Sequence, residues 1–343
     1  MAEYHNPWYT AWQRLKKDPV SILGIVLVIL ILISGILAPV IAPMDPNVQV
    51  LEFRNRPPGF KGLVVRFRVA PGLPLKSVAV TAVEESEDSV LITDQLGRKF
   101  KVERNLLASE SSWYRAYRYW LGTDQFGRDI LSRILYGTRI SLLVGFSAST
   151  LSLLVGLILG AWAGFYGGWR ETIIMRFTDI MFGFPTLLFL IGITAAFEPS
   201  LTVVFFAIGF VSWPGMARLM RGQVVATKQK EFIQAATALG FSGKRILWKH
   251  IVPNCLAPVI VTYTLGIAGA IMAEASLSFL GLGAQPPSPS WGAMINGGKD
   301  FLRIAPWISM APGLAIACTV LGFNLLGDGL RDALDPTSGD RSQ

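Results

Sequence analysis

The chain has 343 residues, of which 52% are hydrophobic and 16% are charged. Soluble domains usually carry about 25% charged residues, so this composition argues against an ordinary soluble enzyme and excludes a disordered chain or a disulfide scaffold. The net charge of +8 comes from basic residues that flank long apolar runs, which indicates contact with anionic membrane lipid and not with nucleic acid. We therefore predict an all-α integral membrane protein.

The first apolar run, from Ser21 to Ile41, is long enough to cross a bilayer, which takes about 20 mostly apolar residues. This run is too long for the hydrophobic region of a signal peptide, and no convincing cleavage site follows it. We therefore predict a cytoplasmic segment at 1–20 and a retained first transmembrane helix at 21–43.

The segment 44–120 differs from the rest of the chain, because apolar and polar residues alternate in it from about 48 to 110. The alternation over 63–69 predicts a strand, and Asp94-Gln-Leu-Gly97 lies between two further strand patterns as an expected hairpin turn. We predict a small β-rich extracytoplasmic insert. It serves either as a solvated addition or as a docking surface for an outside partner.

The remaining chain, 121–343, begins with a turn bracketed by Gly122 and Gly127. Thr123 or Asp124 is placed to cap the helix that follows this turn. We favour this structural role over contact with a solute.

Five further apolar runs complete a prediction of six transmembrane helices, with both chain termini on one side. The runs lie at about 140–165, 177–197, 201–218, 252–280 and 306–327. Basic residues gather in the loop at about 219–251, whereas the two short loops of the other side hold only Lys299 and Arg303. Because short cytoplasmic loops are enriched in Lys and Arg, we predict that this loop and both termini are cytoplasmic.

Small residues recur every four positions in two of the runs and predict close packing or a cavity surface. They are Ser152, Gly156, Gly160 and Gly164 in the second run, and Thr262, Gly266, Ala270, Glu274 and Ser278 in the fifth. Glu274 thus lies either inside the packed bundle or at a hydrated interface, and both alternatives stay open. Asp179, in the third run, either lines a conduit or pairs with Arg176, and we favour the pair.

The loop at about 219–251 contains Glu231-Phe-Ile-Gln-Ala-Ala-Thr-Ala-Leu-Gly240, which favours a short helix closed by its glycine. A second helix, 244–251, leads to Pro253 at the membrane. A short helix of small residues can insert into a groove of another protein. The alternative is an amphipathic helix that lies on lipid through the basic residues of the loop.

This loop resembles the EAA loop of binding-protein-dependent ABC transporter permeases, in which the helix and its glycine are followed by a hydrophobic residue and proline. Three further stretches resemble the C-type permease subunit of the oligopeptide/dipeptide (peptide/opine/nickel) family. They are Leu121-Gly-Thr-Asp-Gln-Phe-Gly-Arg-Asp129, Glu274-Ala-Ser-Leu-Ser-Phe-Leu-Gly-Leu-Gly283 and Leu326-Gly-Asp-Gly-Leu-Arg-Asp-Ala-Leu-Asp-Pro336. The chain departs from the family at Gln234, where Glu is usual, and in its insert, which many relatives lack.

The resemblance implies an importer in the cytoplasmic membrane of a bacterium or archaeon. Its other parts would be a B-type permease subunit, cytoplasmic ATPase subunits and an extracytoplasmic solute-binding protein. The short helix would be the coupling helix that docks on the ATPase. The coupling residues would be Glu231, Gln234, Ala235, Ala236, Leu239, Gly240 and Pro253. Glu274 and Asp179 would be candidates for the translocation path.

The chain offers no catalytic motif of its own. Gly240-Phe-Ser-Gly-Lys-Arg245 has the wrong spacing for a P-loop and lacks its hydroxyl. We expect no catalytic residue, metal or cofactor in this chain, with ATP used by the partner subunits. The alternative function is an ion-driven secondary transporter, which needs internal repeats or paired intramembrane charges, and we see no inverted repeat. The solute stays open among dipeptides, oligopeptides, nickel chelates, glutathione and opines.

Overall fold

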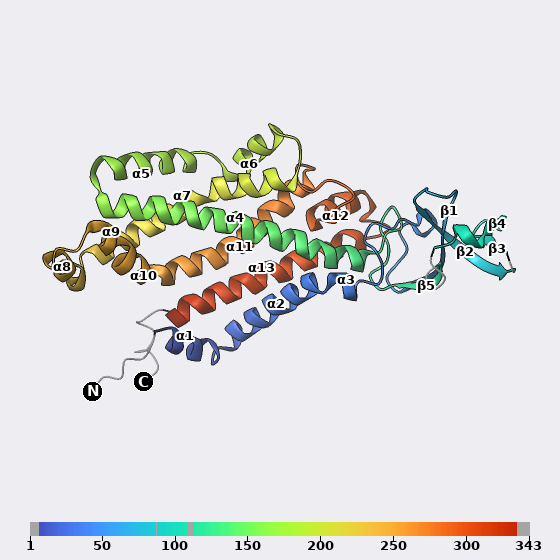
Figure 1. Ribbon diagram of the computed structural model, residues 1–343, viewed down its shortest axis with the longest axis horizontal. Coiled ribbons are helices and arrows are strands. Elements are labelled where there is room, and N and C mark those ends of the chain that lie inside the picture. Colours follow the sequence, from blue (N-terminus) through green and yellow to red (C-terminus); the bar gives the residue numbers. More distant parts are fainter. Residues whose placement is uncertain (1–6, 87, 109–112, 335–343) are drawn as a thin grey trace. The chain divides into compact units, whose positions relative to one another are not determined.

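The computed structural model describes residues 7–86, 88–108 and 113–334 (Figure 1). The N-terminal and insert elements are α1 (Pro7–Leu15), α2 (Pro19–Ile36), α3 (Ala38–Ile41), the 3₁₀ turn η1 (Leu51–Phe53), β1 (Phe60–Arg68), β2 (Leu75–Glu85), β3 (Ser89–Asp94), β4 (Lys99–Glu103), η2 (Arg104–Leu106) and β5 (Tyr114–Tyr119). The elements that follow are α4 (Ile130–Tyr166), α5 (Gly168–Phe182), α6 (Thr186–Ala195), α7 (Leu201–Lys228), α8 (Glu231–Ala238), α9 (Gly243–Arg245), the π-helix η3 (Ile246–Ile251), α10 (Val252–Asn254), α11 (Leu256–Phe279), α12 (Trp291–Gly298), η4 (Lys299–Phe301) and α13 (Trp307–Leu334).

The chain forms two compact units. One unit is helical and, among the described residues, consists of 7–33, Ser141–Gln285 and 316–334. The other unit comprises Ser34–Ile140 and Pro286–Ala315, and it holds the sheet.

Helices of membrane-spanning length dominate the described chain, as predicted. In residues 7–334, apart from the gaps named above, α2, α4, α7, α11 and α13 are long and apolar enough to span a bilayer. The third expected span, about 177–197, is instead two helices, α5 and α6, which meet at 88°. Pro185 explains the break, because proline disfavours helical backbone at the preceding Phe184 and has no N–H to donate.

The small-residue stripe of α4 packs against α7, which confirms its predicted role. A Cβ added at Gly156 would lie 2.6 Å from Cβ of Met216, and one at Gly164 would lie 2.8 Å from the carbonyl oxygen of Arg221. Between them, a Cβ at Gly160 would collide with the Ala217 carbonyl. The glycines therefore let the two backbones approach each other directly.

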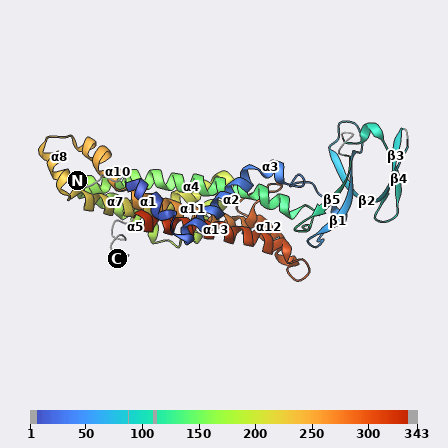
Figure 2. The same cartoon turned by 90° about the horizontal axis from the view of Figure 1, so that it is seen from below.

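Five strands in the described part of the insert form an antiparallel sheet of order β4-β3-β2-β1-β5 (Figure 2). The predicted hairpin turn joins β3 to β4. Oδ1 of Asp94 accepts hydrogen bonds from the backbone N–H groups of Leu96 and Arg98, each at 2.9 Å, and Gly97 has φ +78°. This left-handed conformation suits glycine.

The sheet is larger and more buried than the alternating pattern predicted. Val65 packs in one apolar cluster and its neighbour Val64 in another, together with Phe53 and Tyr119, so β1 is covered on both faces. The strand β5 pairs with β1 although it lies beyond residue 110, where the predicted strand pattern ended.

The turn after the insert is structural, but its cap is not the predicted one. Oδ2 of Asp129 accepts hydrogen bonds from the backbone N–H and the hydroxyl of Ser132, at 2.8 and 2.7 Å, and so caps the start of α4. Asp124 instead closes the turn, because its carboxylate accepts from the backbone and the guanidinium of Arg128. Neither Thr123 nor Asp124 caps the helix.

Candidate functional site

The short helix expected in the loop is α8, and it ends as predicted. Lys230 precedes it with extended backbone, and Glu231 places a carboxylate in the first turn, where the helix dipole favours it. At the other end, Phe241 N–H donates to the Ala236 carbonyl and Gly240 N–H to the Thr237 carbonyl, which is a Schellman arrangement. Gly240 has φ +75° and open space around it, so its backbone conformation, and not crowding, requires glycine.

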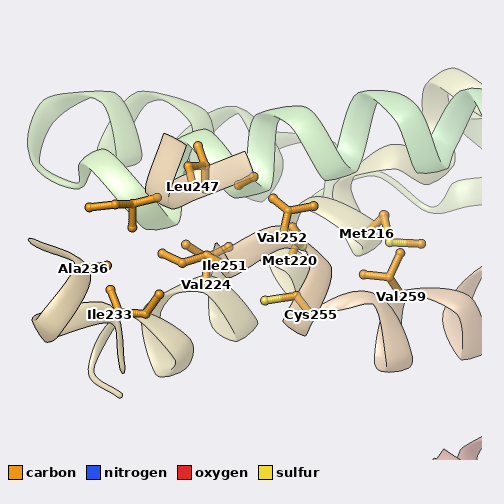
Figure 3. Packing of buried hydrophobic residues seen from close by; sticks show 12 residues of the cluster. Met216, Met220, Val224, Ile233, Ala236, Leu247, Ile251, Val252, Cys255 and Val259 are labelled. Carbon is orange, nitrogen blue, oxygen red and sulfur yellow. The ribbon is translucent and has the colours of Figure 1, made fainter. Parts of the chain in front are cut away.

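One face of α8 is packed inside the chain (Figure 3). Ile233 and Ala236 are 3% and 6% exposed and join an apolar cluster with Val224 of α7 and Ile251 of η3. This corrects the expectation that Ala236 lies close to a partner. Its side chain already has neighbours within the chain, because it lies three positions from Ile233 and therefore on the same side of the helix.

The side of α8 next to this packed face is exposed and partly apolar. Phe232, Ala235 and Leu239 are all exposed, with Leu239 reaching 73%. Their spacing of three and four places them along one side of the helix and its cap. We call these three residues the outer face of α8. Glu231 and Gln234 are also exposed.

Gln234 and Pro253 have local structural roles. The Gln234 side-chain amide donates to the Gln229 carbonyl at the end of α7, at 3.2 Å, a hydrogen bond that the usual glutamate carboxylate could not donate. Pro253 has no N–H and lies in α10, two positions after the last residue of the π-helix η3. The Asn254 side chain donates to the His250 carbonyl at 2.7 Å.

The segment that carries α8 is fixed to the ends of the long helices. Lys228 Nζ donates to the Phe165 carbonyl in the last turn of α4, at 2.7 Å, so this lysine is not simply part of a lipid-facing patch. Arg221 of α7 donates through Nε to Glu171 of α5 at 2.6 Å. The apolar cluster beneath α8 continues through Cys255 to α11. The helix α8 is therefore packed against α7 and, through this cluster, is connected to α11.

Glu274 is fully buried, so of the two open alternatives the structure supports the packed interior. The hydroxyls of Ser278 and Ser141 donate to its carboxylate at 2.6 and 3.4 Å. The Ser278 hydroxyl also accepts from the backbone N–H of Ala284, at 3.3 Å. Glu274 thus ties the end of α11 to α4 and to the chain that follows α11.

Asp179 pairs with Arg218 of α7 and not with the expected Arg176. Nη2 of Arg218 donates to its carboxylate at 2.7 Å, and both side chains are about half exposed. The reason is the packing of α5 on α7, where the rings of Phe177 and Trp213 stack with centroids 5.9 Å apart. This packing brings Asp179 opposite Arg218.

A cavity of about 320 Å³ lies among α4, α6, α7 and α11. The residues that line it in the described chain are uncharged, and neither Glu274 nor Asp179 is among them. Its hydroxyl groups belong to Ser149, Ser152, Thr186, Ser212, Thr262 and Tyr263. Thr262, Gly266 and Ala270 of the α11 stripe line it, as the periodicity predicted.

Ser149 is the unusual residue of this cavity, and sequence reasoning missed it. Its side chain is 6% exposed, and its Oγ has no hydrogen-bond partner among the described residues. Buried polar groups are normally paired. The available signal was its spacing of three from Ser152 on α4, which places both hydroxyls on one face.

These features define a polytopic membrane transport subunit with a cavity lined partly by hydroxyl groups and a short helix anchored in a loop. Residues 156–339 match the family described as "Binding-protein-dependent transport system inner membrane component". Residues 6–58 match "N-terminal TM domain of oligopeptide transport permease C". The chain belongs to the family of binding-protein-dependent ABC transport permeases, and the resemblance seen in its sequence is confirmed.

Curated relatives agree with this assignment. The chain is 51% identical over 218 residues, 64% of its length and 72% of the relative, to the "Dipeptide transport system permease protein DppC" of Alkalihalophilus pseudofirmus. It is 47% identical over 218 residues, again 64% of the chain and 72% of the relative, to the "Glutathione transport system permease protein GsiD" of Pectobacterium atrosepticum. Over 333 residues, 96% of the chain and 95% of the relative, it is 37% identical to the "Dipeptide transport system permease protein DppC" of Haemophilus influenzae. None of these findings supports the ion-driven alternative.

Proposed function

We propose that this permease imports dipeptides or peptides of similar size, such as glutathione, and that the outer face of α8 docks on a separate ATPase subunit. The substrate class rests on the names of the relatives. The docking role rests on one observation above all: Ile233 and Ala236 hold one side of α8 inside the chain, while the adjacent side exposes apolar side chains. Exposed apolar residues next to one another mark contact surfaces.

The proposed orientation places α8 and both termini in the cytoplasm and the β-rich insert outside. Basic residues support it, because Lys230, Lys244, Arg245 and Lys249 lie in the loop of α8. The proposed assembly contains a B-type permease subunit, cytoplasmic ATPases and an extracytoplasmic solute-binding protein. ATP hydrolysis belongs to the ATPases, since the P-loop spacing is absent from the sequence around Gly240.

The proposed mechanism is alternating access. ATP binding changes the positions of the two ATPases, and the outer face of α8 follows them. Because α8 packs on α7 and leads through η3 to α11, its movement alters the two helices that contribute Ser212 and Thr262 to the cavity. ATP can drive this step only if the ATPases bind one packing of the helices more tightly than the other.

The cavity suits brief contact with a peptide. Its uncharged hydroxyls can accept from and donate to peptide amide groups, and the unpaired Oγ of Ser149 offers one such bond. A path that conducts its solute must bind weakly enough to release it, which agrees with the absence of charge among the described lining residues.

The docking role is tested by Leu239→Asp. Because Leu239 is 73% exposed, the change should leave the chain folded, but it places a carboxylate in an apolar contact. ATPase copurification and solute-stimulated ATP hydrolysis should both fall. Leu96→Asp is the matched control, since Leu96 is 77% exposed in the β3–β4 turn. If Leu239→Asp retains normal copurification and coupling, the outer face of α8 is not the docking surface.

A further inference from the structure

An apolar groove lies between α1, α2 and α13 in the helical unit, where Figure 1 shows these helices near one another. Its volume is about 330 Å³. On α13 it follows Leu326, Leu330 and Leu334, whose spacing of four keeps them on one side over about 12 Å of helix. The remaining lining residues are Trp12, Leu15, Ile25, Val28 and Ile29.

The α1 end of this groove has exposed residues of the types that are typical of a membrane–water interface. The helix α2, with a mean hydropathy of 2.8, is a candidate span that begins at Pro19. Directly before it, α1 exposes Tyr9 and Trp12. Tyrosine and tryptophan gather where lipid headgroups meet the hydrocarbon core. The groove therefore extends from headgroup depth into the apolar layer.

Basic residues adjoin the lining residues of the groove. Lys16 Nζ lies 4.8 Å from the ring centroid of Trp12, which lines the groove. Lys17 is exposed next to Lys16, and Arg331 is exposed next to Leu330. These cations favour an occupant that carries negative charge at one end and hydrocarbon at the other.

The acidic side chains nearby do not cancel this charge at the groove. Asp18 is turned onto the start of α2, where its carboxylate accepts from the backbone N–H of Ser21 at 2.8 Å. Asp328 and Asp332 lie two positions from Leu330 and are therefore about 200° around α13 from it, away from the groove. Arg14 and Asp332 already have interaction partners within the chain.

We propose that this groove binds an acyl chain of an anionic phospholipid, whose phosphate is held by Lys16, Lys17 and Arg331. The bound lipid fixes α1 against α2 and α13. A larger apolar groove of about 820 Å³, lined by Phe177 and Trp213 among others, has no basic residue among its described lining residues. Nothing there distinguishes lipid from a neighbouring protein helix.

The test uses the full-length chain, copurified with its partner subunits, in nanodiscs of phosphatidylcholine and phosphatidylglycerol. In one preparation the phosphatidylglycerol carries brominated acyl chains, and in the other the phosphatidylcholine does, at equal mole fraction. Bromine in the groove quenches the fluorescence of Trp12. A Trp12→Phe variant removes this signal, so the difference between the two proteins isolates it from the other tryptophans.

Brominated phosphatidylglycerol should quench Trp12 more strongly than brominated phosphatidylcholine. Each basic side chain near an anionic lipid contributes about a fivefold preference, so replacing Lys16, Lys17 and Arg331 together by Gln should abolish the preference. In that variant, continued quenching by phosphatidylcholine shows that the groove is intact and open. The control variant replaces three cations of the α8 loop by Gln, namely Lys244, Arg245 and Lys249. It should keep the preference for phosphatidylglycerol.

Three results would overturn the proposal. Equal quenching of wild-type Trp12 by the two lipids would make the groove an ordinary lipid-facing surface. Absence of quenching by either lipid would mean that another protein segment covers it. A preference that survives loss of all three cations would place the phosphate elsewhere.

Discussion

The neighbours Ala235 and Ala236 provide a sharp test of how α8 is oriented. They are about 100° apart around the helix, and only Ala236 is packed inside the chain, at 6% exposure. Replacing Ala236 by Trp must force a large ring between α8 and the residues around Val224, and overpacking of this kind costs about 1–3 kcal/mol or more. The same change at the exposed Ala235 should alter the stability of the chain by no more than about 0.5 kcal/mol.

The assay separates stability from docking. Thermal unfolding of the purified chain without its partners should show a clear loss of stability for Ala236→Trp and none for Ala235→Trp. ATPase copurification should fall for Ala235→Trp, because the indole obstructs the outer face of α8 while the chain stays folded. If Ala235→Trp destabilises the isolated chain and Ala236→Trp does not, α8 presents the other face, and the docking surface is assigned wrongly.

Three further predictions concern the helices and their caps. Gly160→Leu should lower thermal stability by about 1–3 kcal/mol or more, because its side chain would meet the Ala217 carbonyl, whereas Gly192→Leu, with open space around Gly192, should not. Burial raises the pKa of Asp129 above its ordinary value of 3.8, with hydrogen bonds at its carboxylate opposing the rise. Ionisation of Asp129 therefore destabilises the fold. As the pH rises from 3.8 through the raised pKa, the wild-type chain should lose stability relative to Asp129→Asn. Unfolding of the two proteins measured across this pH range makes the comparison directly. Parallel unfolding curves would contradict this. Glu274→Gln should retain the serine hydrogen bonds and near-normal stability. Glu274→Leu removes the acceptor of two buried hydroxyl donors, Ser278 and Ser141, at a cost of about 1–3 kcal/mol each. Equal stability of the two variants would count against a packed Glu274.

Features encoded by local spacing could be predicted from the sequence. The glycine stripe of α4 predicted close helix packing, since a period of four keeps residues on one face whatever the partner helix is. The end of α8 was predictable because Gly240 follows a run of helix-forming residues. The turn at Asp94–Gly97 was predictable for the same reason, since its chemistry is contained in four residues.

Features that depend on tertiary contacts were predicted less well. Asp179 has a candidate partner one turn away, but the packing of α5 on α7 brings Arg218 closer. Ala236 and Ala235 are the same residue type, and only the cluster around Ile233 decides which of them is buried. The unpaired hydroxyl of Ser149 likewise exists only because four helices surround it.

Two features that were not predicted, the strand β5 and the break between α5 and α6, do have signals in the sequence. Residues Tyr114–Tyr119 of β5 are rich in tyrosine, which favours strands, but their partner β1 is far away in the chain. The break between α5 and α6 coincides with Pro185 inside an otherwise continuous apolar run. Hydropathy alone predicts one continuous helix here, because a hydropathy scale does not take into account that Pro185 lacks a backbone N–H donor.

Transport into vesicles tests most directly whether this permease is driven by ATP through separate subunits. The chain and its partner subunits are reconstituted in sealed vesicles with the ATPases facing the medium that contains ATP. We predict that movement of a labelled dipeptide requires ATP and its binding protein, and continues when ionophores collapse all ion gradients. Transport that continues without ATP and stops when the gradients collapse would contradict the claim and establish the ion-driven alternative.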